Sequence, residues 1–226
     1  MADMNADTTK WHYAEGKRDE MVRFIPRDTR TLLDVGCGRG GFGANLKSKF
    51  DLEVHGVELN AEAAGHARTR LDRVFELDLE RDSQGLPDSR YDVVTFLDVL
   101  EHLQDPWSLL KRSHAWLRPG GTVVASLPNM RYYPVLKDLV LAKRFEYVDS
   151  GVLDRTHLRF FTLSGIDRLF RDAGFRQVRI EGINGGPLPW KLALLSRLLG
   201  DTLNDTRYVQ FAVTARLGDE LPLPTA

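Results

Sequence analysis

A glycine-rich turn directly after a buried strand is the feature that most constrains this sequence. The apolar run at 32–35 stops at residues 36–41, where four of six residues are glycine, and a helical pattern begins at Ala44. Glycine permits positive φ and a close approach of the backbone to a ligand. A strand, such a turn and a helix N-terminus together form an amide-lined site for an anion or a nucleoside-bearing cofactor. The sequence therefore predicts a cofactor-binding α/β unit.

The glycines fit two cofactor patterns equally well. Gly36, Gly38 and Gly41 satisfy the dinucleotide pattern G-x-G-x-x-G, and an acid, Glu58, follows at about the expected distance. Gly36, Gly38 and Gly40 satisfy G-x-G-x-G, with Asp34 on the strand just before it. The loop alone does not choose between these two patterns.

Two further acids follow predicted strands. Glu58 ends the strand at 52–57, where it can accept hydrogen bonds from a ribose diol, although a helix cap or a surface acid fits the same position. Asp78 ends the strand at 73–77, where a carboxylate can accept from an adenine amino group. Ligands of open α/β sheets bind outside the carboxyl ends of the strands. Both acids are therefore candidates for cofactor binding.

The order of elements predicts an α/β fold. Strands alternate with helices, and the strand at 91–97 is apolar throughout, as in a strand buried on both faces of a parallel sheet. Residues 208–213 alternate between apolar and polar, which favours a last strand that pairs antiparallel. We expect a Rossmann-like, doubly wound, mostly parallel seven-stranded sheet with an antiparallel last strand, helices on both faces and an inserted cap over the active site.

The chain is expected to form a single domain over residues 1–226. A helix at 10–25 precedes the first strand and ends at Pro26. Residues 130–161 interrupt the alternation and form an inserted cap over the substrate. Residues 184–205 contain an apolar helix that is expected to pack in the core, act as a lid or form an interface, with a membrane-surface helix as the alternative. Residues 217–226 form a frayed tail.

Composition excludes several classes of protein. The 31 basic and 32 acidic side chains leave a net charge of −1, which does not indicate a nucleic-acid partner. The single cysteine, Cys37, allows no intramolecular disulfide and suits packing better than nucleophilic catalysis. The start of the chain is polar, and no apolar run approaches the ~20 residues of a membrane span. We expect a soluble, cytoplasmic protein without stable membrane insertion, and residues 184–205 leave a homodimer open.

Taken together, these motifs resemble the class I S-adenosylmethionine-dependent methyltransferases. The resemblance is to the branch that includes ubiquinone-biosynthesis-like enzymes and bacterial enzymes that modify sugars and small molecules. It spans residues 10–183 and rests on LLDVGCGRGGFG at 32–43, Glu58, Asp78, YDVVTFLDVLEHL at 91–103, LRPGGTVVASLPN at 117–129 and DRTHLRFFT at 154–162. It favours the G-x-G-x-G pattern, because a dehydrogenase explains neither Asp78 nor the Leu-Glu-His and Pro-Gly-Gly segments.

The resemblance implies S-adenosylmethionine as cofactor and S-adenosylhomocysteine as product. The residues it places at the cofactor are Asp34, Gly36, Cys37, Gly38, Gly40, Glu58, Leu59, Asp78, Leu79, Leu97, Asp98, Tyr13 and Arg18. Asp34 and the loop backbone face the methionine part, Glu58 the ribose, and Asp78 with Leu79 the adenine. Leu97 and Asp98 lie beneath the cofactor near the sulfonium. Tyr13 and Arg18, on the opening helix, close over the cofactor and meet its carboxylate.

Two of the six histidines are candidates for catalysis. A hydroxyl acceptor must lose its proton, and histidine suits that role near neutral pH. His157 lies in the cap and is the first candidate for the base, and His102 just past a strand end is the second; a structural role is the alternative for both. The histidines lack metal-ligand spacing, so no metal site is expected. The residues expected to bind the substrate are Tyr132, Asp154, Arg155 and Arg159, for which a local salt-bridge network is the alternative.

The function predicted from the sequence is methyl transfer to a hydroxyl of a sugar or another small polar metabolite. N-methylation of a small amine or amino sugar is the alternative enzyme activity, which needs less help from a base because an amine can attack in its neutral form. A non-catalytic cofactor-binding module is the third hypothesis. The presence together of Asp34, Glu58 and Asp78 argues against that module, because a degenerate domain is free to lose them.

Overall fold

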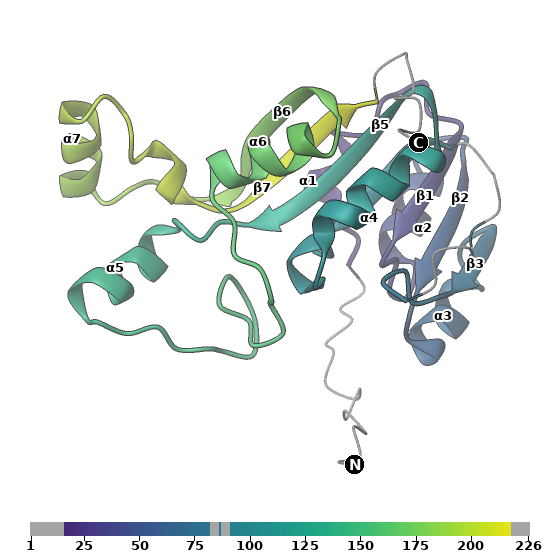
Figure 1. The fold of residues 1–226 in the computed structure, drawn as a ribbon, viewed down its shortest axis with the longest axis horizontal. Coiled ribbons are helices and arrows are strands. Elements are labelled where there is room, and N and C mark those ends of the chain that lie inside the picture. Colours follow the sequence, from purple (N-terminus) through teal and green to yellow (C-terminus); the bar gives the residue numbers. More distant parts are fainter. Residues whose placement is uncertain (1–15, 82–85, 87–90, 218–226) are drawn as a thin grey trace, which may run out of the picture.

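In a computed structural model, which describes residues 16–81, 86 and 91–217, the chain forms a seven-stranded sheet (Figure 1). The order of the strands is β3-β2-β1-β4-β5-β7-β6. The strands are β1 (Thr31–Val35), β2 (Glu53–Glu58), β3 (Arg73–Glu76), β4 (Tyr91–Leu97), β5 (Leu117–Pro128), β6 (Arg176–Gly185) and β7 (Tyr208–Arg216). The glycine-rich turn follows β1, which lies near the middle of the sheet.

The pairing of the strands confirms the predicted topology. Strands β3, β2, β1, β4 and β5 pair in parallel, as expected from the alternation of strands and helices. The last strand, β7, pairs antiparallel with both β5 and β6 and lies between them. Because the carboxyl ends of the parallel strands share one edge, the residues that follow β1, β2, β3 and β4 are brought together there.

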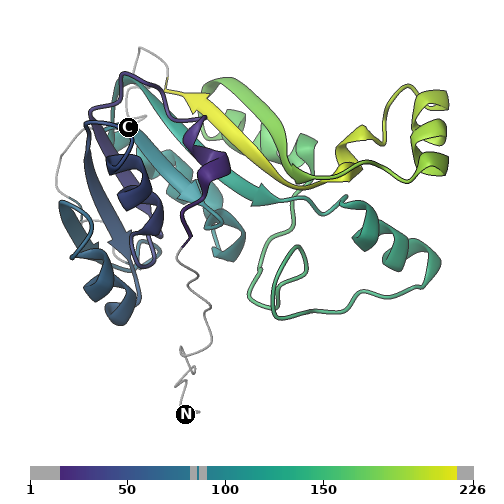
Figure 2. The same cartoon turned by 180° about the vertical axis from the view of Figure 1, so that it is seen from behind.

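Helices cover both faces of the sheet, as predicted. The helices are α1 (Asp19–Val22), α2 (Gly41–Lys47), α3 (Ala61–Ala67), α4 (Pro106–Arg112), α5 (Tyr133–Leu141), α6 (Leu163–Asp172) and α7 (Trp190–Leu198), with short 3-10 turns at η2 (Leu100–His102), η3 (Ser113–Ala115) and η4 (Asn204–Arg207). Helices α4 and α6 lie over one face in Figure 1, and α1 and α2 lie over the opposite face in Figure 2. Side-chain N-caps fix the starts of α4 and α6: Asp105 accepts from the Ser108 amide at 3.0 Å, and Thr162 accepts from the Gly165 amide at 3.3 Å.

The helix predicted over 10–25 is much shorter in the described residues. Only Asp19–Val22 is helical there, and residues 10–15 lie outside the described part of the chain. Arg18, directly before the helix, has a left-handed backbone with φ 46°. That conformation is incompatible with a continuous helix through this position. The prediction of one helix up to Pro26 was therefore wrong for the residues that the structure describes.

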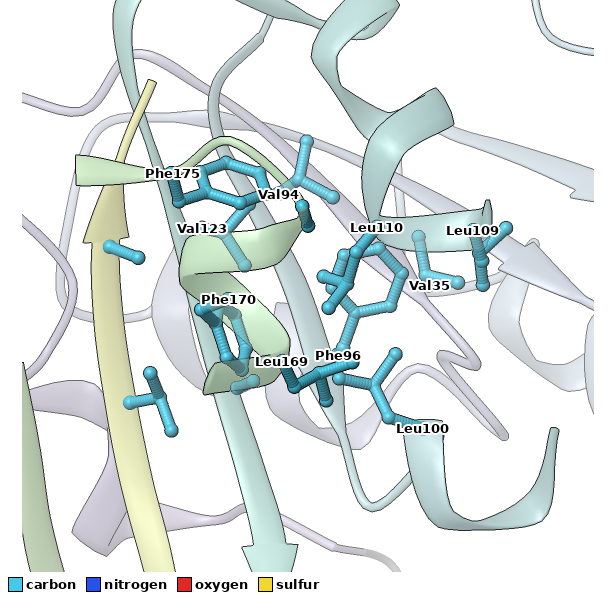
Figure 3. Packing of buried hydrophobic residues seen from close by; sticks show 14 of the residues in the cluster. Val35, Val94, Phe96, Leu100, Leu109, Leu110, Val123, Leu169, Phe170 and Phe175 are labelled. Carbon is cyan, nitrogen blue, oxygen red and sulfur yellow. The ribbon is translucent and has the colours of Figure 1, made fainter. Parts of the chain in front are cut away.

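The main core lies between the sheet and the layer formed by α4 and α6. Figure 3 shows Leu109 and Leu110 of α4 and Leu169 and Phe170 of α6 pointing toward Phe96 and other side chains of the strands. Val93 of β4 packs in a second cluster, with Leu32 and Val124. Strand β4 is thus buried on both faces, as its apolar run predicted.

Helices α5 and α7 project from the sheet beyond the end of β5 (Figures 1 and 2). Helix α5 has no buried residue and α7 buries only Ser196. The expectation that the apolar segment at 184–205 packs in the core was therefore wrong, because the β6–β7 hairpin carries α7 away from the body of the protein. Among the described residues, no helix has both the length and the apolar character required to cross a membrane.

Candidate active site

The glycine turn is fixed by hydrogen bonds to the neighbouring strand. The amides of Gly36 and Cys37 donate to the carbonyl of Val57 at 2.8 and 3.0 Å, so the loop follows the end of β2 closely. Gly36 has φ +71°, and a Cβ there would lie 2.6 Å from a methyl carbon of Val99. Only glycine meets both demands without strain. Cys37 is buried, and burial raises the pKa of its thiol well above the usual range, which agrees with a packing role.

Glu58 is oriented by two backbone amides at the end of β2. Its Oε2 accepts from the Gly38 amide at 2.9 Å, and its Oε1 accepts from the Asn60 amide at 2.8 Å. A carboxylate oxygen can accept more than one hydrogen bond. Next to it, the side chain of Leu59 is 66% exposed at the same strand end. The glycine turn and the predicted ribose acid are thus parts of one bonded unit.

Asp34 is a buried acid beneath the glycine turn. Its Oδ1 accepts a hydrogen bond from the Thr95 hydroxyl of β4 at 2.6 Å. Burial raises the pKa of Asp34 to about 7, and the charge of Glu58 acts in the same direction, while the Thr95 hydroxyl opposes the shift. The sequence placed Asp34 at the turn, but it did not indicate Thr95 as its partner.

This raised pKa makes stability depend on pH. Since the pKa of Asp34 is higher in the folded chain than its unfolded value of 3.8, folding favours the protonated acid. We expect the contribution of Asp34 to the free energy of unfolding to be complete below pH 3.8 and to be lost as the pH rises through about 7. Urea unfolding of the wild type and of Asp34→Asn across this window tests it, because the amide variant should lose this component. An identical pH dependence in both proteins would contradict the assignment.

Asp98 follows β4 and is held in a network that joins three distant parts of the chain. It has a left-handed backbone (φ 56°) and forms an ion pair with Arg18. Its Oδ1 accepts from the hydroxyl of Ser126 at 2.8 Å and from the side-chain amide of Gln210 at 2.7 Å. The sequence did not point to Ser126 or Gln210 as partners of Asp98; for Ser126, a hydroxyl inside the apolar strand β5 was the available signal. That Arg18 meets the cofactor carboxylate stays a prediction.

The other residues predicted at the cofactor lie along the same edge or just below it. Asp78 follows β3, where its carboxylate accepts from the Glu80 amide at 3.0 Å and lies 3.3 Å from Arg81. Leu79 beside it is buried, and Leu97 at the end of β4 is half-buried. Tyr13 lies outside the described residues. The structure therefore brings the predicted acids of β1, β2 and β3 and Asp98 of β4 to one edge of the sheet.

Beyond Asp98, the turn η2 and the cap form a cluster of three ionisable side chains, of which Glu101 and His157 are buried and His102 is half-buried. Glu101 and His102 belong to η2, and His157 comes from the cap. The Nε2 atom of His157 lies 4.0 Å from Oε1 of Glu101, and the two histidine rings are 4.8 Å apart between their centroids. One ligand atom from each of the three side chains lies within 4.8 Å of the others. Sequence spacing indicated no such group, because its members come from two separated segments.

Backbone hydrogen bonds explain why the cap returns to η2. The amides of Leu158 and Arg159 donate to the Glu101 carbonyl at 2.8 and 3.0 Å. The Met130 amide donates to the Phe161 carbonyl at 2.8 Å, which joins the two ends of the cap. The segments 98–103 and 154–162 are therefore joined directly by backbone hydrogen bonds. This explains how His102 and His157, predicted separately, come together.

Burial shifts the pKa values within this cluster in opposite directions. Burial raises the pKa of Glu101 well above its usual value, and the nearby charge of Asp98 adds to the shift. Burial also lowers the pKa of His102, and the neighbouring His157 adds to that shift. Both shifts favour neutral side chains when nothing positive is bound between them.

The predicted substrate-binding residues make mainly local contacts. Asp154 accepts from the amide and the hydroxyl of Thr156 at 2.8 and 2.6 Å. Arg155 pairs with Asp149 at 2.6 Å, and Arg159 donates to the Gln104 carbonyl. Tyr132 is half-buried at the start of α5. These contacts resemble the local network that was the alternative interpretation, and binding of substrate by these residues stays a prediction.

The sheet order, the glycine turn after β1 and the acids at the strand ends define the fold of a Rossmann-like, S-adenosylmethionine-dependent methyltransferase. The family model described as "Methyltransferase domain" matches residues 11–180, and the chain belongs to this family. The recognition made from the sequence motifs is thereby confirmed, as are the enzyme class and its cofactor.

Similar proteins agree with the assignment to this family. The chain is 30% identical over 194 residues to a ubiquinone biosynthesis O-methyltransferase of Hydrogenovibrio crunogenus, covering 83% of this chain and 79% of that protein. Among solved structures, a SAM-dependent methyltransferase from Archaeoglobus fulgidus superposes with a TM-score of 0.63 at 21% identity, covering 88% and 92% of the two chains. Human N-acetylserotonin methyltransferase in complex with SAM superposes with a TM-score of 0.60 at 19% identity, covering 90% and 52%.

The described residues fit this cofactor. Glycine at position 36 lets the turn adopt a positive φ and pack against Val99, and the carboxylate of Glu58, oriented by the Gly38 amide, is an acceptor suited to a diol. The exposed side chain of Leu59 offers an apolar surface beside them. These features lie along one strand edge, where the fold class binds its ligands.

Proposed function

We propose that this methyltransferase acts on a hydroxyl of a sugar or another small polar metabolite. The observation that carries the proposal is the Glu101–His102–His157 cluster, which lies next to Asp98 beyond the carboxyl end of β4. A hydroxyl must lose its proton to become a good nucleophile, whereas an amine attacks in its neutral form. A buried group of acid and imidazole side chains at the acceptor side therefore favours oxygen as the acceptor atom. The relative from Hydrogenovibrio crunogenus is also named as an O-methyltransferase.

Different parts of the chain would bind the cofactor and cover the acceptor. When bound, S-adenosylmethionine supplies an electrophilic methyl group. The turn at 36–40 would hold the methionine part of the cofactor, and Glu58, which is bonded to that turn, would hold the ribose. The side chains joined to Asp98 would lie near the sulfonium. The cap closes the acceptor side and excludes water. Orientation of this kind supplies about 7–11 kcal/mol toward an in-line displacement.

The cluster then assists removal of the hydroxyl proton. One way to remove the proton is for His157 to act as the base, and His102 is the second candidate. The Nδ1 atom of His157 lies 3.0 Å from the Val152 carbonyl, which only accepts, so Nδ1 carries the hydrogen and Nε2 carries the lone pair. That lone pair faces Glu101 inside the cap. Loss of the ring should therefore affect chemistry more than cofactor binding.

The acceptor class is tested by incubating the purified chain with isotopically methyl-labelled S-adenosylmethionine and matched panels of sugars, phenols, amino sugars and amines. We expect labelled methyl ethers, identified by mass spectrometry and by the methyl carbon shift. Labelled N-methyl products alone would show that the acceptor atom is nitrogen. Binding of the cofactor without transfer to any acceptor in a cell extract would favour the non-catalytic module.

His157→Ala is expected to lower turnover by about 100-fold or more, which is the usual contribution of proton transfer by a positioned side chain. Affinity for S-adenosylhomocysteine should remain within about twofold of the wild type, because His157 lies in the cap and not at the glycine turn. Steady-state kinetics and calorimetry measure the two effects. His66→Ala, on the exposed side of α3, is the matched control. Unchanged turnover in His157→Ala would refute the role of this ring.

A further inference from the structure

The carboxylate of Glu101 lacks the hydrogen bonds that a buried acid requires. The residue is fully buried, and neither carboxylate oxygen has a hydrogen-bond partner among the described residues. Burying a polar group without a partner is unfavourable, and burying an unpaired charge is far more so. A further positive species, either a proton or a metal ion, must therefore accompany this carboxylate. The distances to the surrounding atoms distinguish a proton from a metal ion.

The spacing of the atoms suits a shared ion better than a shared proton. The 4.0 Å between Oε1 of Glu101 and Nε2 of His157 exceeds the ~3.2 Å limit of a hydrogen bond. A metal ion bound at about 2.0–2.2 Å from each ligand holds two ligand atoms about 3–4.3 Å apart. All three candidate ligand atoms lie within 4.8 Å of one another, so a small movement of the side chains encloses one ion.

The second ring nitrogen of each histidine is fixed by a backbone carbonyl. Nδ1 of His157 lies 3.0 Å from the Val152 carbonyl, and Nδ1 of His102 lies 3.2 Å from the Thr156 carbonyl. Each Nδ1 therefore donates, and in the neutral ring the lone pair resides on Nε2. Histidines that bind metal ions are oriented by this kind of hydrogen bond on the opposite nitrogen.

We propose that Glu101, His102 and His157 bind one divalent first-row metal ion, such as Mn²⁺, Co²⁺ or Zn²⁺. One carboxylate and two imidazoles form a donor set typical of these ions, whereas Mg²⁺ and Ca²⁺ favour oxygen ligands. Three protein ligands leave coordination positions open, as in catalytic metal sites. The ion lies beyond the end of β4 and on the cap side of Asp98, where the proposed function places the methyl acceptor.

The ion would carry out the deprotonation assigned to the cluster, and this part rests on the proposed function. A hydroxyl bound to a divalent ion loses its proton to solvent more readily. The resulting oxygen forms a bond to the methyl carbon as the carbon–sulfur bond breaks, and S-adenosylhomocysteine leaves. The two histidines then act as ligands and not as bases.

Metal binding is measured first, on the full chain treated with a chelator and dialysed. We expect Co²⁺ to bind with one ion per chain and to give visible absorption bands, and Mn²⁺ to give the same stoichiometry by electron paramagnetic resonance. Glu101→Gln and His157→Gln should each weaken binding by about 100-fold or more, with circular dichroism to confirm folding. If the wild type binds no stoichiometric ion, the proposal is overturned.

The chain offers a matched control for these variants. Glu62 and His66 on α3 form another glutamate–histidine pair, with 3.9 Å between the corresponding atoms, but both side chains are exposed. Glu62→Gln and His66→Gln should leave Co²⁺ binding unchanged. Equal loss of binding in both sets of variants, or in neither, would show that the ion is not held by the buried cluster.

A second measurement separates this proposal from the proposed function. Methyl transfer and S-adenosylhomocysteine binding are compared in the metal-free and Mn²⁺-loaded chain. Transfer that disappears without metal and returns with Mn²⁺ supports the role of the ion. Full transfer by metal-free protein overturns that role and leaves a histidine as the base. One bound ion per chain without transfer to any hydroxyl supports the metal site while the proposed acceptor class fails.

Discussion

Glu58→Ala is expected to lower affinity for S-adenosylhomocysteine by about 100-fold or more. The side chain is held at the end of β2 by the amides of Gly38 and Asn60, so its carboxylate is oriented before a ligand binds. Hydrogen bonds to a charged group contribute about 1.5–3 kcal/mol each. Two such bonds to a ribose diol therefore contribute about 3–6 kcal/mol, and each 1.4 kcal/mol corresponds to a factor of about ten in affinity.

Calorimetry with S-adenosylhomocysteine measures this loss directly. Glu62→Ala is the control, because Glu62 lies nearby on α3 with its side chain exposed, and it should bind like the wild type. The substitution at Glu58 also removes an acceptor from the Gly38 amide, so thermal unfolding is needed to show that the glycine turn survives. A folded Glu58→Ala protein whose affinity falls by less than about fivefold would show that the ribose is held elsewhere.

The cofactor half of the site was accessible from the sequence because it depends on local order. Strand, glycine turn and helix follow one another closely at 31–47, and each predicted acid lies within its own strand near the carboxyl end or just past that end. Parallel pairing then brings strand ends together without further information. Asp34, Glu58 and Asp78 could therefore be placed at one edge from the order of elements alone.

The acceptor half could not be derived in this way, because its contacts join segments far apart in the chain. The amides of residues 158 and 159 return to the carbonyl of Glu101, and no periodicity of the sequence encodes that return. Gln210 reaches Asp98 because the antiparallel β7 pairs with β5 in one particular register. Similarly, the apolar pattern of α7 predicted burial, but the position of the β6–β7 hairpin leaves that helix projecting.

Helix α6 contributes to the core and also anchors the end of the cap. Phe161 ends the cap and pairs with Asn129 at the end of β5, and α6 begins directly after it. The side chains of α6 then cover the face of β4 and β5 (Figure 3). The position of the cap therefore depends on how firmly α6 is held to the sheet.

Phe170→Ala is expected to reduce the free energy of unfolding by about 3–5 kcal/mol, since truncating a buried phenylalanine removes apolar contacts and leaves a cavity. Phe170 is fully buried, and its ring lies 6.1 Å from that of Phe175 at a tilted angle. Urea unfolding followed by circular dichroism measures the change. Because typical domains are stable by only about 5–15 kcal/mol, this single substitution is expected to remove a large part of the total.

Two control variants show which layer holds the fold together. Leu163 lies on the same helix as Phe170 but is 40% exposed, so Leu163→Ala should lower the free energy of unfolding by less than about 1 kcal/mol. Val140→Ala on α5 should cost no more, because α5 has no buried residue and contributes little to the core. A similar loss in all three variants would contradict a core centred on α4, α6 and the sheet. We expect the largest loss for Phe170→Ala and small losses for Leu163→Ala and Val140→Ala. This result would show that the sheet with α4 and α6 stabilises the fold, and that the cap is attached to this body through β5, η2 and α6.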